Sequence, residues 1–327
     1  TMPENRPGRR GLLLGTAALA APAAVRAQAA WPGERPIGFV VPFPPGGGTD
    51  VMARAMVPHL ERHLPGARFV VLNRPGAGAE IGYTAVATAA PDGYTIGVAI
   101  TPSLQTITIE RQPRYRLEDL AYLGAVVDDP GAFFVAPDSD IRTLRDLAAF
   151  ARANPDRVAV GTAGSGSDDH LRSEADQRAA GVRMTHVPFQ GQAPTITALL
   201  GRHITVAAMN IGESMELLRQ GQVRGLAMAG GRRWSVAPDL PTFREAGFDI
   251  TGGVIRGLIM PGATPEPIQS RLAAALDAVM RDAAWQAEAD RLFQPLRRMD
   301  AAEYRRAVFA AAEELRALWR QTPWRDQ

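Results

Sequence analysis

The chain has 327 residues, of which 46% are hydrophobic and 21% are charged, so it is long enough for one large or two medium-sized globular domains. It contains no cysteine, which excludes disulfides and thiolate metal sites. All 36 basic residues are arginine and the formal net charge is +2, so no mechanism that needs a lysine amine is available.

The N-terminal stretch predicts an export signal. Arg9 and Arg10 precede the apolar run "GLLLGTAALAAPAAV", which is too short and too rich in Gly and Ala to span a bilayer. The small-x-small pattern that ends at Ala27 predicts cleavage there, so we interpret residues 1–27 as a signal peptide and expect a periplasmic protein. The paired arginines fit twin-arginine export incompletely, so Sec export stays open.

The signal also accounts for the basic charge. Four arginines and one glutamate give it a net charge of +3, which leaves about −1 for the remaining chain. A chain with this balance is not expected to bind nucleic acid.

Strand-like and helix-like patterns alternate from residue 37 onward, which predicts an α/β fold with mainly parallel sheets. In the first series we expect strands at 37–43, 68–72 and 95–100, with a helix over 51–64 and a second helix that ends near residue 90. Residues 117–127 and the proline-ended strand 132–137 follow.

A second series of alternating elements begins at a helix over 143–153, which Thr143 can cap. Further strands are expected at 157–162, 184–187, 206–209, 225–228 and 257–265, and helices at 170–180 and 194–200. Two long helices, near 266–281 and 301–319, end the chain and are expected to pack on the first series.

We therefore predict two α/β lobes joined by two crossover strands, one near 132–137 and one near 254–261. The first lobe comprises residues 31–132 and 255–327, and the second lobe comprises residues 133–254.

Each predicted lobe carries a glycine-rich loop between its first strand and the following helix. "PPGGGTD" ends the first strand, and "TAGSGSDD" has the same place in the second lobe. Such loops present unpaired N–H groups at the positive end of a helix dipole, and Thr49, Ser165 and Ser167 add hydroxyl donors. Ligands of open α/β sheets lie beyond the carboxyl ends of the strands, where both loops fall. A single loop of this kind is equally consistent with a structural turn, but the pair indicates a small carboxylate bound between the lobes.

Other functions fit the sequence less well. A P-loop needs a lysine, and the three glycines of "GTAGSG" lack the dinucleotide-binding spacing. The nucleophile pattern G-x-S-x-G is absent, and "HLERH" supplies two histidines without an evident third ligand. We expect no catalytic residue, no metal and no cofactor, interpret His59 and His63 as a solvated helix face, and interpret His170 as a residue that orients its loop.

Six ordered stretches resemble the substrate-binding receptors of tripartite tricarboxylate transporters, the Bug family. They are "RPIGFVVPFPPGGGTDVMARAM", "VVLNRPGAGAEIGYTAVATAAPDGYTI", "GTAGSGSDDHLRSEAD", "THVPFQGQAPTITALLG", "VRGLAM…RR…APDLPTFREAGF" and "GLIMPGATP". The resemblance runs from about Arg35 to the C-terminal helices.

The resemblance implies a type II, Venus-flytrap periplasmic binding protein that captures a small organic acid (a carboxylate or an acidic amino acid). It also implies delivery of that acid to the membrane permease subunits of a tripartite tricarboxylate transporter, and we expect a monomer. A receptor that signals to a sensor kinase and an exported enzyme that uses Asp50, Asp168 or His170 remain alternatives.

By position, the ligand loops of the family fall on these residues: Phe43, Gly46, Gly47, Gly48, Thr49, Asp50, Thr101, Ser103, Ala163, Gly164, Ser165, Gly166, Ser167, His170, Phe189, Gln190 and Asn210. Glu80 departs from the family pattern, which usually has a small or amide residue at this position. A carboxylate close to the binding site would repel an acid unless it points away or meets an ammonium group.

Overall fold

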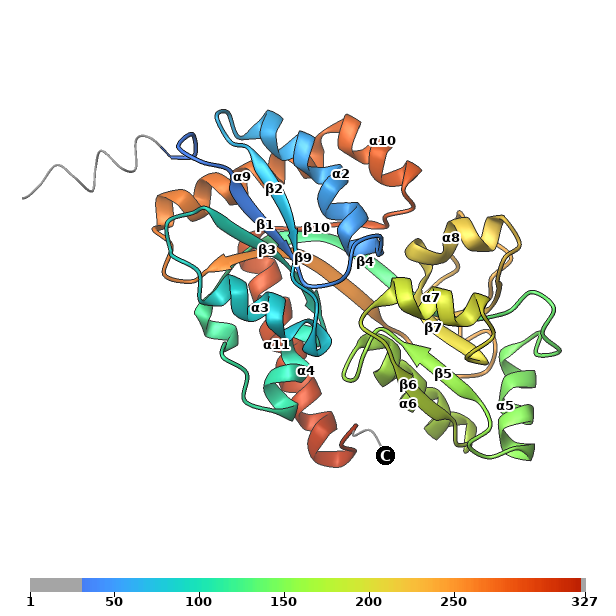
Figure 1. The fold of residues 1–327 in the computed structure, drawn as a ribbon. Coiled ribbons are helices and arrows are strands. Elements are labelled where there is room, and N and C mark those ends of the chain that lie inside the picture. Colours follow the sequence, from blue (N-terminus) through green and yellow to red (C-terminus); the bar gives the residue numbers. More distant parts are fainter. Residues whose placement is uncertain (1–30, 325–327) are drawn as a thin grey trace, which may run out of the picture.

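The computed structural model describes residues 31–324, so the predicted signal at residues 1–27 lies outside the described part of the chain. Two α/β lobes lie side by side and are joined by two long strands (Figure 1). None of the helices between residues 31 and 324 combines the length and apolar character that a bilayer span requires.

The first lobe contains the expected alternation of strands and helices. Its elements in chain order are β1 (Ile37–Val41), α2 (Gly48–His63), β2 (Phe69–Asn73), the 3-10 turn η1 (Ala77–Ala79), α3 (Glu80–Ala87), β3 (Thr95–Thr101), α4 (Ser103–Glu110) and the 3-10 turn η2 (Leu117–Asp119). The strands β2, β1 and β3 pair in parallel in that order.

The second lobe is built in the same way. It contains α5 (Leu144–Ala153), β5 (Ala159–Thr162), α6 (Asp168–Ala180), β6 (Thr185–Pro188), α7 (Gln192–Leu200), β7 (Val206–Asn210), α8 (Ile211–Arg219) and β8 (Arg224–Met228). Here β6, β5 and β7 are parallel neighbours. Thr143 caps α5 as predicted: its side chain accepts from the Asp146 N–H at 3.1 Å, and Asp146 accepts from the Thr143 N–H in return.

The crossover strands are β4 (Leu120–Val135) and β9 (Gly253–Pro261). They pair with each other in antiparallel fashion from Leu120 opposite Pro261 to Pro130 opposite Gly253, with register shifts near Gly124 and Val127. Every antiparallel ladder in the described sheet involves one of these two strands, whereas the remaining ladders are parallel.

The C-terminal segment packs against the first lobe, as the sequence predicted. It consists of α9 (Glu266–Arg281), α10 (Ala283–Arg291), β10 (Leu296–Met299) and α11 (Ala301–Gln321). Helices α9 and α10 contact α2, and α11 contacts α4.

Each lobe buries both faces of its sheet, as parallel sheets require. In β4, Phe133 packs with the cluster on the α5 face, and Phe134 packs with the cluster on the α7 and α8 face. Consecutive strand residues point to opposite faces, so one strand serves two apolar layers.

The prediction of a solvated face for the two α2 histidines was wrong. His59 is 7% exposed and packs edge-on against Trp285 at 5.4 Å between ring centroids. His63 lies 3.0 Å from the Asp282 carboxylate, which caps α10. Among residues 31–324, no cluster of three potential metal ligands occurs.

Asp176 on α6 gives the second lobe a measurable pH dependence. It is 1% exposed and one carboxylate oxygen has no partner among the described residues. Burial raises its pKa from 3.8 to about 7. Between these values the folded chain keeps a proton that the unfolded chain releases, so the contribution of Asp176 to stability falls as pH rises.

We therefore expect Asp176→Asn to raise the free energy of unfolding by about 1–3 kcal/mol at pH 8, because the buried charge is removed. The gain should shrink toward pH 4, as measured by thermal unfolding across this range. Asp249→Asn is the control, since the side chain of Asp249 is 85% exposed. An equal gain at both pH values would contradict the assignment.

Candidate ligand-binding site

A cavity lies where the two lobes and the crossover strand β9 meet. The first lobe lines it with Phe43, Gly47, Gly48, Thr49, Ile100 and Ser103. The second lobe contributes Ala163, Ser167, Asp168, Gln192, Asn210 and Glu213, and β9 contributes Val254 and Arg256. The volume open to water-sized molecules is about 30 Å³.

Asp50 fixes the conformation of the first glycine loop through hydrogen bonds. Its carboxylate accepts from the Gly46 N–H at 3.0 Å, and also binds Arg54 and Asn73. Gly46 has φ +88°, a conformation that favours glycine. Gly47 precedes α2 in extended conformation and has no side-chain cap, so the first N–H groups of this helix are available to an anion.

The pKa of Asp50 reflects this role. Burial alone would raise it, but the hydrogen bonds from Arg54, the Gly46 N–H and Asn73 outweigh burial and hold the pKa below its ordinary value. Asp50 is therefore a charged support of the loop at neutral pH.

The second glycine loop has a matching support. The Gly166 N–H donates to Nδ1 of His170 at 3.1 Å, four residues onward as in the first loop. Ser167 caps α6 by accepting from the His170 N–H at 3.2 Å. His170 is 1% exposed and its ring stacks on His186 at 3.8 Å between centroids. It orients the loop and does not line the cavity.

Each loop contacts a helix of the other lobe. Thr106 of α4 donates its hydroxyl to the Gly166 carbonyl at 2.8 Å. Gly48 of α2 lies against Glu213 of α8 so closely that an added Cβ would be 2.3 Å from its Cγ. Both contacts join residues of the first lobe to residues of the second.

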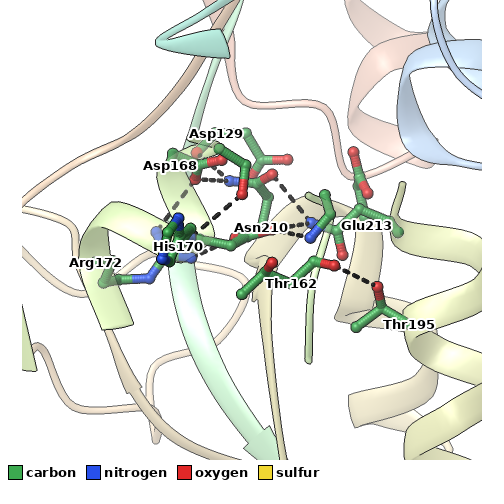
Figure 2. A network of polar contacts seen from close by, with 12 residues as sticks. Asp129, Thr162, Asp168, His170, Arg172, Thr195, Asn210 and Glu213 are labelled. Carbon is green, nitrogen blue, oxygen red and sulfur yellow. Dashed lines mark hydrogen bonds and ion pairs between the residues drawn. The ribbon is translucent and has the colours of Figure 1, made fainter. Parts of the chain in front are cut away.

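A buried polar network begins in the first turn of α6, directly after the second loop (Figure 2). Arg172 donates to Asp168 at 3.2 Å and to Asp169 at 2.5 Å, and its side chain is 3% exposed. Asn210 donates to Asp168 at 3.0 Å, and Gln192 donates to Asp169 at 3.0 Å. These bonds fix the cavity side of α6, α7 and β7.

The network continues to the crossover strands. Arg256 of β9 donates to Asp129 of β4 at 3.1 Å and also binds Glu213. Asp129 accepts from the Gly212 N–H at 2.9 Å. The Arg256 side chain is 1% exposed and that of Glu213 is 4% exposed, so this is a buried ion-pair cluster that needs all of its partners.

Burial dominates the protonation of the acids in this cluster. It raises the pKa of Asp129 to about 6 and that of Glu213 to about 7, although the neighbouring Arg256 works in the opposite direction. Burial and the adjacent Asp168 also raise the pKa of Asp169. Glu213 in the cavity wall and its neighbour Asp129 in the same cluster therefore titrate closer to neutral pH than ordinary carboxyl groups.

The structure brings many of the predicted site residues together. The cavity contains Phe43, Gly47, Gly48, Thr49, Ser103, Ala163, Ser167 and Asn210. The loops themselves are shaped by Gly46, Asp50, Gly164, Gly166 and His170.

The remaining predicted residues lie elsewhere. Thr101 lines a separate groove with Arg297 and Trp234. Ser165, Phe189 and Gln190 are not part of the cavity lining, and Phe189 packs on the apolar cluster near α7. Glu80 pairs with Arg111 at 2.6 Å and does not line the cavity either.

Sequence reasoning missed Ile100, Gln192, Glu213, Val254 and Arg256 as site residues, and it considered Asp168 only for the enzyme alternative. One signal was present: Arg256 interrupts the apolar run "GVIRGLIMP", and Asp129 interrupts "LGAVVDDPGAFFV". A charge inside a buried strand requires a partner, and these two residues are partners.

The fold and the cavity at the junction of the lobes define a two-lobed periplasmic binding protein. Residues 52–316 match the model of the tripartite tricarboxylate transporter family receptor. The chain belongs to this family, so the resemblance seen in the sequence is confirmed at the level of the family.

Two similar proteins support this family assignment. Protein BugT of Bordetella pertussis is 35% identical over 73% of this chain and 72% of its own length. The solved structure of the periplasmic binding protein BugD has a TM-score of 0.83 and 28% identity, and it covers 90% of this chain and 99% of its own.

Two further solved structures contain acids. MatC from Rhodopseudomonas palustris has bound malate, with a TM-score of 0.81, 27% identity, and coverage of 87% of this chain and 99% of its own. Another R. palustris protein was solved with adipate. It has a TM-score of 0.83 and 27% identity, and the match covers 89% of this chain and 97% of the other.

The contact between the lobes at Gly166 can be tested with a matched pair of variants. A Cβ at Gly166 would lie 2.4 Å from Oε1 of Glu110 and 2.7 Å from Oγ1 of Thr106, both in the first lobe. Gly181 has a similar φ (+62° against +71°), but an added Cβ would meet nothing within 4 Å.

We expect Gly166→Ala and Gly181→Ala each to lose about 1 kcal/mol of stability from backbone strain. Only Gly166→Ala should increase the radius of gyration in small-angle X-ray scattering, because its methyl group separates the lobes. Identical scattering of the two variants would refute the role of this contact.

Proposed function

We propose that the protein is a periplasmic receptor that captures a small organic acid between its lobes and delivers it to the membrane permease subunits of a tripartite tricarboxylate transporter. The mature receptor begins near residue 28, after cleavage at Ala27, and acts as a monomer. The carboxylate-binding function follows the family, whereas the permease and the oligomeric state are our proposal.

The observation that carries the proposal is the meeting of two helix N-termini in one cavity. Gly48 and Thr49 begin α2, while Ser167 and Asp168 begin α6, and all four residues line the cavity. Helix N-termini attract carboxylates through unpaired N–H groups and the helix dipole. The acids bound to two relatives, malate and adipate, are of the size class that we propose for the ligand.

We further propose that the lobes comprise residues 31–132 with 255–327 and residues 133–254, and that they close on the ligand. A ligand that touches both lobes favours the closed form by its differential affinity for that form. The crossover strands β4 and β9 run past both proposed boundaries, so they would carry the hinge.

An exported enzyme is less consistent with the side chains. Asp50 and His170 each accept a hydrogen bond from a glycine amide of their loop. Asp168 binds both Arg172 and Asn210. The three groups considered as acid or base thus have structural partners, and the family and its structural neighbours are binding proteins.

Ser103 offers a direct test of ligand binding. It is 6% exposed, begins α4 and lines the cavity. Isothermal titration should detect binding of malate or adipate by the wild type, and we expect Ser103→Ala to weaken it about 3- to 10-fold through the loss of one hydroxyl donor. Ser235→Ala, at an exposed position of the second lobe outside the cavity lining, should leave the affinity unchanged.

A further inference from the structure

Arg256 is the one guanidinium among the residues that line the cavity. It donates to Asp129 and Glu213, and its Nε atom is buried without a partner among the described residues. A guanidinium is a planar donor that binds carboxylates in two-pronged fashion. From its position in the cavity wall it can therefore bind either the carboxylate of a ligand or that of Glu213.

Glu213 reaches from α8 of the second lobe to the start of α2 in the first. Its side chain lies directly over Gly48, and its Oε2 atom is buried without a hydrogen-bond partner among the described residues. The same carboxylate binds Nη2 of Arg256. The start of α2 and an arginine thus both contact one carboxylate that belongs to the protein itself.

The cavity is too small to admit an organic acid while Glu213 stays in its present position. A volume of about 30 Å³ holds about two water molecules, so an organic acid enters only when a side chain moves. Asp129 shares Arg256 with Glu213, and Asp168 lines the same cavity as Glu213. A second carboxylate beside Glu213 would add a further like charge to a buried site, which is strongly unfavourable.

We propose that Glu213 is an internal competitor of the ligand, and that Arg256 binds the carboxylate of the ligand once Glu213 has been displaced. The inference rests on the proposed function and adds to it the residue that sets affinity. An acid must replace the contacts of Glu213 with Gly48 and Arg256, so the receptor selects ligands whose carboxylate forms both.

The test compares the wild type with three variants by isothermal titration with malate and with adipate. Glu213→Gln keeps the shape but removes the competing charge, and we expect binding at least about ten-fold tighter than in the wild type, the scale of one charge-assisted hydrogen bond. Glu216→Gln removes the same charge from the exposed side of the same helix and should not change the affinity. Glu213→Ala should act in the same direction as Glu213→Gln.

Arg256 is tested in a background that carries both Asp129→Asn and Glu213→Gln, because Arg256→Gln alone would leave two buried carboxyl groups without their partner. We expect Arg256→Gln to weaken binding of the acid in this background, while circular dichroism confirms that the variant is folded. Equal affinity with and without Arg256→Gln in this background would remove Arg256 from the ligand site.

The two proposals fail in different ways. Binding by the wild type without any gain in Glu213→Gln and Glu213→Ala overturns the competitor role alone, and weaker binding by these variants makes Glu213 a ligand contact instead. Binding that appears only in the Glu213 variants supports the competitor role. No binding of either acid by any of the proteins contradicts the carboxylate receptor and the competitor together.

Discussion

The ion-pair cluster of Asp129, Arg256 and Glu213 is the interaction on which the cavity depends. It joins both crossover strands to α8, and through Gly48 it reaches the first lobe. Three charged groups are withdrawn from water there, which is favourable only while each has its partners. Asp129 is also bound by the Gly212 N–H at 2.9 Å, so the start of α8 is fixed by the same cluster that forms the cavity wall.

The two glycine loops are supported by the same kind of hydrogen bond, made by a different side chain in each. In each loop a side chain four residues beyond a glycine of positive φ accepts the N–H of that glycine: Asp50 for Gly46 and His170 for Gly166. This bond satisfies the amide of that glycine. The start of each following helix lines the cavity, where the helix dipole favours negative charge.

The sequence was sufficient for the fold and for the loops, because both depend on local patterns. Alternating strands and helices appeared close to their predicted positions, and "PPGGGTD" and "TAGSGSDD" lie at the cavity. It was insufficient for Glu213 and Arg256. Helix α8 was not predicted, and Arg256 lay within the predicted crossover strand near 254–261 but was not recognised as a site residue. The partners of Arg256 stand 127 and 43 residues away, and no local pattern reveals such a pairing.

The crossover strands have a mechanical consequence. Strand β4 is continuous over 16 residues and is hydrogen-bonded to β9 along the segment between the lobes. A paired ribbon of this kind resists torsion more than a single extended linker would, so rotation of one lobe against the other has to twist the ladder itself. The register shifts near Gly124 and Val127 are the points at which the ladder is already interrupted. If the lobes close as we propose, elastic deformation of this ladder limits how far the two halves separate.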